Sequence, residues 1–244
     1  MPRWTELTHL SFVKAISGTR VAILPTGSLE AHGNHLPLGT DTILPEYLAD
    51  RVSRRTHALV LPPIPFGDSW ALEGFAGTVT VRHQTLVEFY CEVMESIFRN
   101  GLSRIVVLNG HGGNTSAIES AAKTATQDND RIVVIVNWWV DLAKETRREV
   151  LETPEGHAAE DETSELMYVR PDLVDMTDLK SSTVLMRYRV ISAEHRNDLY
   201  RYAASGDPGK ANPEKGKRIL ESAEDELVHL VEDLERDLLP VERG

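Results

Sequence analysis

Four side chains that can bind metals or transfer protons lie close together near the N-terminus. The segment PTGSLEAHGNHLPLGTD, residues 25–41, contains Glu30, His32, His35 and Asp41 and follows an apolar run. It is too polar for a core and too rich in glycine for a helix, so we expect a loop. In an extended loop Glu30 and His32 point to the same side, because side chains alternate along the chain. Carboxylates and neutral imidazoles are common ligands of Zn²⁺, Mn²⁺ and Fe²⁺, and a carboxylate such as Asp41 can bridge two ions ~3.5–4 Å apart.

Further imidazoles and carboxylates occur in two later segments. NGHGGN, residues 109–114, contains His111, and EGHAAEDETSE, residues 155–165, contains His157 and Glu162. Each segment has an ordinary interpretation when it is taken alone. The first could be an anion-binding loop at a helix N-terminus, and the second could be the acidic first turn of a helix. Taken together with the first loop, they favour one shared site for divalent metal ions.

Apolar, β-branched runs alternate with helical patterns, and these elements would position the loops. The apolar runs suit strands buried on both faces, as parallel sheets require, and lie at 20–24, 58–62, 104–110 and 131–139. Helical patterns lie at 45–56, 84–101, 115–126 and, after the cap Asn212, along the C-terminal segment to 239. Short accessory strands are expected at 76–83 and 182–191. Ligand-binding loops gather at the carboxyl ends of parallel strands, so the polar segments should meet there.

Composition excludes several classes of protein. The chain has 244 residues and a formal net charge of −12, which argues against binding to nucleic acid or to anionic lipid. No apolar run reaches the ~20 residues of a membrane span. The single cysteine, Cys91, excludes an intrachain disulfide and favours a reducing compartment. We expect a cytoplasmic protein whose residues 1–244 form a single domain.

The three polar segments together resemble the motifs of the creatininase (creatinine amidohydrolase) family. LPTGSLEAHGNHLPLGTD resembles the first family motif, VVLNGHGGN the second and HAAEDETS the third, and GFAGT and GDPGKANPEKGK are also similar to family segments. The form of the second and third motifs is that of the H-G-G-N / H-A-x-x-x-E-T-S branch rather than of creatininase itself. The resemblance implies an α/β fold, a three-layer α/β/α sandwich with a mainly parallel central sheet. It also implies two divalent ions per chain (Zn, Mn or Fe), a small-molecule substrate and a homo-oligomer, trimeric or hexameric.

The resemblance also assigns metal ligands to positions of this chain. One metal would be held by Glu30 and Asp41. The second would be held by His32, Asp41 and His111. His35 matches no ligand position and is interpreted as support for the ligands.

Creatininase itself has a glutamate two residues after the histidine of the second motif, where this chain has Gly113. The branch with H-G-G-N has the glutamate of E-T-S, so Glu162 is assigned as the missing ligand of the first metal. His157 matches a histidine near the substrate and would shuttle a proton, so the expected catalytic residues are His157 and Glu162. The residues expected to bind substrate are Trp138, Trp139, Trp70, Gly112 and Gly113.

The activity implied by the resemblance is hydrolysis by an activated water. The two metals would lower the pKa of that water and polarise a carbonyl of a small substrate. The bond broken is expected to be an amide C–N bond other than an ordinary peptide bond, in a cyclic amide or a formamide. Alternatives within the family are a C–C hydrolase of an inositol-derived inosose and a mycofactocin-type peptidase. A non-catalytic metal-binding relative is the alternative from another class.

Overall fold

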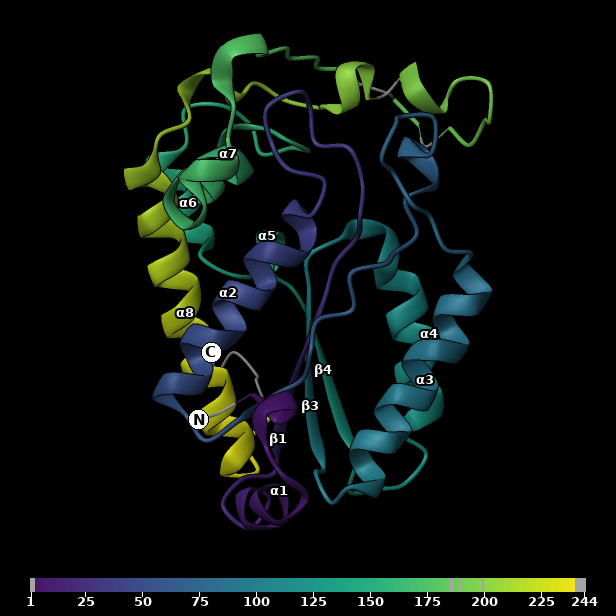
Figure 1. Ribbon diagram of the computed structural model, residues 1–244, viewed down its shortest axis with the longest axis vertical. Helices are drawn as coiled ribbons and strands as arrows, with labels where there is room; N and C mark the ends of the chain where they lie inside the picture. Colours follow the sequence, from purple (N-terminus) through teal and green to yellow (C-terminus); the bar gives the residue numbers. More distant parts are fainter. Residues whose placement is uncertain (1–2, 185–186, 189, 199, 240–244) are drawn as a thin grey trace.

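The centre of the molecule is a parallel sheet whose four strands follow the order β2-β1-β3-β4 (Figure 1). The computed structural model describes residues 3–184, 187–188, 190–198 and 200–239. The strands are β1 (Val21–Thr26), β2 (Leu59–Val60), β3 (Arg104–Asn109) and β4 (Ile132–Asn137). Each lies within one of the four predicted apolar runs or extends it by a residue or two, so the prediction of a parallel sheet is confirmed.

Helices cover both faces of this sheet. The helices are α1 (His9–Ala15), α2 (Thr40–Arg55), α3 (His83–Arg99), α4 (Thr115–Ala125), α5 (Trp138–Asp141), α6 (Lys144–Val150), α7 (Glu160–Val169) and α8 (Pro213–Glu235). In Figure 1, α3 and α4 lie on one side of the strands, and α2, α6, α7 and α8 lie on the other. The predicted three-layer α/β/α architecture is therefore confirmed. In the described part of the chain, no helix has the length and apolar character needed to cross a membrane.

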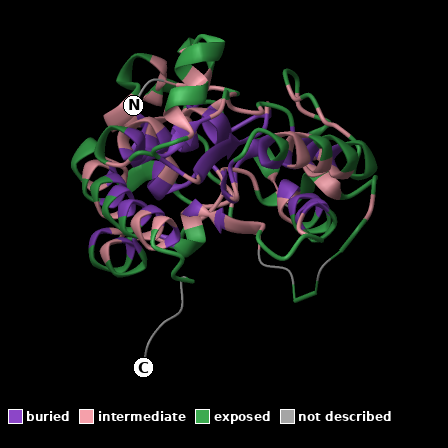
Figure 2. Cartoon of the chain, turned by 90° about the horizontal axis from the view of Figure 1, so that it is seen from below, coloured by how far each residue is buried: buried purple, intermediate pink, exposed green. Residues whose placement is uncertain are grey.

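Alternating residues of β1 divide the core into two halves. Ala22 and Leu24 face the side chains of α3 and α4, whereas Val21 and Ile23 face those of α2 and α8. This division follows from the two-residue period of a strand. Figure 2 shows the resulting buried layer along the strands and along the helix faces that cover them. A strand buried on both faces needs apolar residues on both sides, which explains the continuous apolar run 21–24 of β1.

Three predicted elements differ from the structure. Residues 76–82 form isolated bridges, Leu29 with Val79 and Gly67 with Thr80, and His83 begins α3. The hydroxyls of Thr78 and Thr80 accept hydrogen bonds from the N–H groups of Ala31 and Ser69. The expected strand 182–191 forms one bridge, from Ser182, and residues 185, 186 and 189 lie outside the described residues. The C-terminal helix begins at the predicted cap but ends at Glu235 rather than at 239.

The last residue of each of three neighbouring strands is polar, and these three residues lie in register. Thr26, Asn109 and Asn137 are aligned across β1, β3 and β4. Thr26 Oγ1 donates to Asn109 Oδ1 (3.0 Å), and Asn109 Nδ2 donates to Asn137 Oδ1 (2.8 Å). Asn109 also holds the next loop, because its amide contacts both the carbonyl (2.8 Å) and the N–H (3.1 Å) of His111. This row fixes the direction in which the site loops leave the sheet.

A buried arginine joins α6 to α7. The side chain of Arg147 is 3% exposed, and its guanidinium lies 3.4 Å from Asp161 Oδ2 and 3.0 Å from Glu165 Oε1. The guanidinium also lies over the ring of Trp138, 5.1 Å from its centroid. Burial, opposed by the charge of Arg147, raises the pKa of Asp161 to about 6 and that of Glu165 to about 8. The cation therefore holds two buried acidic groups of α7 in place.

We predict that Arg147→Met destabilises the fold by ~3–5 kcal/mol at pH 8, because two buried carboxylates lose their cation. The loss should be smaller at pH 5, since carboxyl groups whose folded pKa is raised hold protons at low pH and lose them as the pH rises. Urea unfolding at the two pH values measures both effects. The control is Arg148→Met on the same helix, because Arg148 is 72% exposed and, among the described residues, pairs with Glu145 alone. Equal destabilisation by the two variants would contradict this interpretation of the cluster.

Candidate metal centre

The carboxylate of Asp41 lies between two imidazoles. Asp41 Oδ1 is 2.9 Å from His32 Nε2, and Asp41 Oδ2 is 2.9 Å from His111 Nδ1. His32 comes from the loop after β1, Asp41 from the first turn of α2, and His111 from the loop after β3. The predicted convergence of separate loops at the carboxyl ends of the strands is what the structure shows.

A close backbone contact brings the β3 loop to α2. A β-carbon on Gly110 would lie 2.0 Å from the carbonyl oxygen of Asp41 and 2.9 Å from the ring of Pro45. No side chain fits at such a distance, so glycine is required at this position. The contact places His111, the next residue, directly beside the Asp41 carboxylate.

Three imidazoles of the site each donate an N–H to a backbone carbonyl. The pairs are His32 Nδ1 with Glu30 (3.1 Å), His111 Nε2 with Asp68 (2.9 Å) and His157 Nε2 with Ala31 (2.8 Å). A carbonyl oxygen can only accept, so each of these nitrogens carries its proton. The other nitrogen of each ring faces the carboxylates, and it can offer a lone pair to a metal ion once any proton there has left. Metal-binding histidines are usually fixed in this way.

Glu162 reaches the same cluster from α7. Its Oε2 lies 3.9 Å from His32 Nε2 and accepts a hydrogen bond from the N–H of Ala158 (2.6 Å). The start of α7 is held in turn by His35, whose Nε2 lies 3.0 Å from Thr163 Oγ1. His35 thus contacts the helix that carries Glu162, and its supporting role stays a prediction.

Donor atoms in the described residues gather into three groups within 4.8 Å. The groups are Glu30, Asp41, His111; His32, Asp41, Glu162; and Glu30, His32, His157. This grouping differs from the expected one, in which His111 accompanied His32 and Glu162 accompanied Glu30. The difference follows from the direction from which each segment approaches. The β3 loop enters beside Glu30, with His111 Nδ1 3.3 Å from Glu30 Oε1, whereas α7 enters beside His32.

Without metal ions, the cluster retains protons. Burial disfavours a charged His32, yet the charge and hydrogen bond of Asp41 outweigh it and raise the pKa of His32 to about 10. At His111, burial also lowers the pKa, but the charges and hydrogen bonds of Glu30 and Asp41 outweigh burial and raise the pKa well above its usual value. Burial raises the pKa of Glu162 to about 8, although the charge of His32 opposes this shift. Binding of cations would displace these protons, so metal affinity should increase with pH.

The donor set fits divalent transition metals. Glu30 Oε2 is buried and has no hydrogen-bond partner among the described residues, which is costly for a carboxylate oxygen unless a cation satisfies it. Carboxylates and imidazoles at these distances are a typical environment for Zn²⁺, Mn²⁺ or Fe²⁺.

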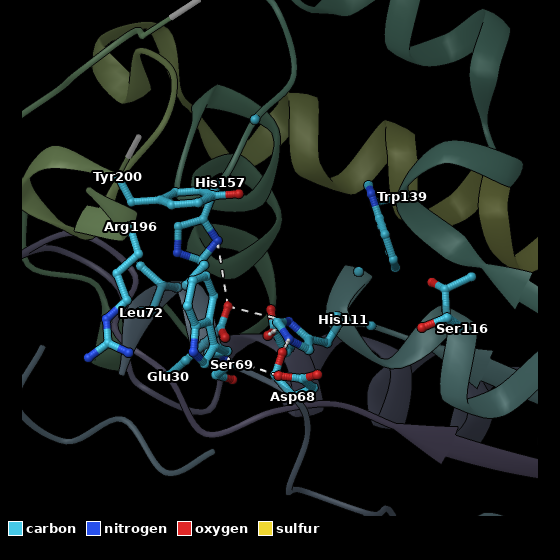
Figure 3. Close-up of a pocket in the computed structure, with 18 of the residues that line it drawn as sticks. Glu30, Asp68, Ser69, Leu72, His111, Ser116, Trp139, His157, Arg196 and Tyr200 are labelled. Carbon is cyan, nitrogen blue, oxygen red and sulfur yellow. Dashed lines mark hydrogen bonds and ion pairs between the residues drawn. The ribbon is translucent and has the colours of Figure 1, made fainter. Parts of the chain in front are cut away.

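A cavity of about 1090 Å³ opens over the cluster (Figure 3). Four of the expected substrate-binding residues line it: Trp70, Trp139, Gly112 and Gly113. Trp138, the fifth, lies in the core under Arg147 and is not among the lining residues described. Sequence reasoning missed Tyr200 and Arg196, which line the cavity from a segment that carries no recognisable motif.

The sequence profile described as "Creatininase: Creatinine amidohydrolase" matches residues 5–231. The chain belongs to the creatininase family. Together with the donor groups, this membership makes it a metal-dependent hydrolase of that family.

Curated relatives in this family act on different substrates. Creatinine amidohydrolase of Pseudomonas putida is 30% identical over 70% of this chain and 73% of its own length. The mycofactocin precursor peptide peptidase of Mycolicibacterium smegmatis is 30% identical over 82% of this chain and 79% of its own length. The 3-dehydro-scyllo-inosose hydrolase of Thermotoga maritima is 30% identical over 89% of this chain and 77% of its own length. Similarity at this level does not separate the branches.

Solved creatininase structures share the fold of this chain. One described as "Creatininase Mn" has a TM-score of 0.82 and 25% identity, covering 95% of this chain and 98% of that one. A creatininase variant described as "Zn-Zn type" has a TM-score of 0.82 and 25% identity, covering 95% of this chain and 97% of that one.

The backbone around Gly113 leaves no room for a glutamate side chain at this position. A β-carbon on Gly113 would lie 2.0 Å from the carbonyl oxygen of Asp68 and 2.6 Å from His111 Nε2. The same carbonyl accepts the proton of His111 Nε2 and so orients the ring (Figure 3). In this chain, the space that a side chain would need is occupied by the group that fixes His111.

We predict that Gly113→Ala weakens metal binding ~10–100-fold, because the β-carbon displaces the Asp68 carbonyl that orients His111. Competition with a metal chelator measures the affinity. Gly112→Ala is the matched control, since its nearest atom would be the Trp139 ring at 3.7 Å, an ordinary contact. If both variants bind metal as the unaltered chain does, the Asp68 carbonyl does not control His111.

Proposed function

We propose that this protein is a two-metal amidohydrolase that breaks an amide C–N bond of a small acyl substrate. The observation that carries the proposal is the Asp41 carboxylate, each oxygen of which lies 2.9 Å from an imidazole of a different donor group. A carboxylate between two sets of ligands is the usual arrangement in a two-metal hydrolytic site.

We assign two ions to the two groups that share Asp41. Glu30, Asp41 and His111 would hold one ion, and His32, Asp41 and Glu162 would hold the other. Zn²⁺, Mn²⁺ and Fe²⁺ all suit these ligands. When bound, such ions lower the pKa of a coordinated water from 15.7 towards roughly 7 and polarise a substrate carbonyl.

We assign proton transfer to His157. Its Nε2 is engaged by the Ala31 carbonyl, so Nδ1 is the nitrogen free to exchange a proton with water or substrate in the cavity. Burial and the charge of His32 lower the pKa of His157 to about 4, so the ring is neutral at pH 7 and can accept a proton. It would then release that proton to the leaving nitrogen.

The cavity favours a substrate larger than a single five-membered ring. At about 1090 Å³ it exceeds the roughly 300–1,000 Å³ range of pockets that enclose drug-sized ligands. Trp70 and Trp139 provide flat apolar walls for the part of the substrate next to the scissile bond. A short peptide is therefore the second candidate substrate. An inosose is the third candidate, because hydrolysis of a C–C bond beside a ketone uses the same carbonyl chemistry.

The experiment that tests the proposal is a screen of the metal-loaded protein against cyclic amides, formamides, short peptides and inososes. Release of amine or ammonia from an amide supports the proposal. Turnover of an inosose alone would contradict C–N specificity. Two bound ions without turnover of any class would indicate a binding protein rather than an enzyme.

We predict that Glu162→Gln removes one ion of the two and leaves the ion held by Glu30, Asp41 and His111. Metal analysis after gel filtration measures the ratio. Glu160→Gln is the control, because the side chain of Glu160 pairs with Lys215 and accepts from the N–H of Thr153, away from the donor groups. Loss of an ion from the control, or two ions in Glu162→Gln, would refute the assignment of Glu162.

We predict that His157→Ala retains both ions while kcat falls ~10²–10⁴-fold on the substrate that the screen identifies, as is usual for a lost acid–base group. His195→Ala, which alters a histidine 57% exposed at the surface, should leave kcat unchanged. Loss of metal from His157→Ala would instead indicate that His157 is a ligand, together with Glu30 and His32 of the same donor group.

A further inference from the structure

A strap formed by residues 200–205 crosses the metal-binding loops. The carbonyl of Ala203 accepts a hydrogen bond from the N–H of Gly33 (2.7 Å), next to His32 in the first loop. The N–H of Ser205 donates to the carbonyl of His157 (2.8 Å). The strap is thus tied to the β1 loop and to the segment before α7.

The backbone of the strap is strained where it meets the site. Tyr202 has φ of 64° and Ala203 has φ of 52°, so two consecutive non-glycine residues adopt left-handed backbone. Such residues persist only when their surroundings hold them, and they are most frequent at active sites. The hydrogen bonds described above supply that restraint.

The strain holds Tyr200 against His157. The N–H of Ala203 donates to the carbonyl of Tyr200 (2.7 Å), which closes the turn. The rings of Tyr200 and His157 meet edge to face, with centroids 5.4 Å apart and planes at 83°. Figure 3 shows the Tyr200 ring beside His157. Tyr200 therefore lies next to the group that we assign to proton transfer.

The hydroxyl of Tyr200 is available to a ligand. Tyr200 lines the cavity together with Glu30 and Glu162, and its phenol oxygen makes no hydrogen bond to the described residues. A phenol ordinarily titrates at a pKa of about 10, so the hydroxyl of Tyr200 keeps its proton at neutral pH. The ring of Tyr200 is half-buried while its hydroxyl lies at the cavity, where a bound substrate can supply a hydrogen-bond partner.

We propose that Tyr200 is a further catalytic residue, whose hydroxyl donates a hydrogen bond to the substrate carbonyl oxygen as negative charge develops there. This inference rests on the proposed amidohydrolase function. The phenol retains its proton throughout, so no covalent step is involved. A fixed donor aimed at a developing oxyanion stabilises the transition state more than the ground state.

The test uses Tyr200→Phe and, as its matched control, Tyr202→Phe. Both substitutions remove one hydroxyl from the same strap, and Tyr202 is 42% exposed. The probe is acetohydroxamate, which places a charged oxygen on divalent ions and needs no knowledge of the substrate. Calorimetric titration of the metal-loaded proteins gives its affinity, and metal analysis gives the ion content.

Tyr200→Phe should retain both ions and bind acetohydroxamate ~10–100-fold more weakly, the usual effect of losing a hydrogen bond to a charged group. On the substrate from the screen, kcat should fall ~10²-fold or more with little change in KM. Tyr202→Phe should match the unaltered protein in both measurements.

Equal affinity for acetohydroxamate in Tyr200→Phe and Tyr202→Phe would overturn the proposal. Loss of metal from Tyr200→Phe would also overturn it, since the tyrosine would then only support the ligand loops. Failure of the unaltered protein to bind two ions would be a different result, because it would refute the two-metal function itself.

Discussion

The site depends on one carboxylate that faces two imidazoles. Asp41 lies 2.9 Å from His32 and 2.9 Å from His111, and Glu30 and Glu162 add their charges within the same small volume. In an apolar interior these groups can coexist only if protons or cations balance them. The raised pKa values of His32 and His111 show how protons do so in the metal-free chain. Divalent ions would do the same with stronger bonds.

Much of the surrounding structure follows from the need to bring three chain segments to that carboxylate. The row of Thr26, Asn109 and Asn137 sets the direction of the loops, and the contact at Gly110 closes the β3 loop onto α2. On the opposite side, Arg147 holds two acidic groups of α7. That anchoring fixes the helix from which Glu162 reaches the cluster. Stability and site geometry are therefore linked through α7.

The sequence revealed the layered fold because strands buried on both faces need apolar residues on both sides, and the central residues of β1 and β3 are apolar. It also revealed which loops would meet, since carboxyl ends of parallel strands share an edge. The pairing of ligands could not be predicted, because it depends on the direction from which α7 and the β3 loop approach. Trp138 and Trp139 are adjacent in sequence, yet one enters the core and the other the cavity. Tyr200 carried no signal, because a strained turn and not a motif positions it.

The central claim is that Asp41 bridges two ions, and anomalous diffraction from metal-soaked crystals tests it most directly. We expect two peaks roughly 3.5–4 Å apart, the usual spacing of a two-metal site, one on each side of the Asp41 carboxylate. One peak should contact Glu30 and His111, and the other should contact His32 and Glu162. A single peak, or two peaks that do not share Asp41, would contradict the account.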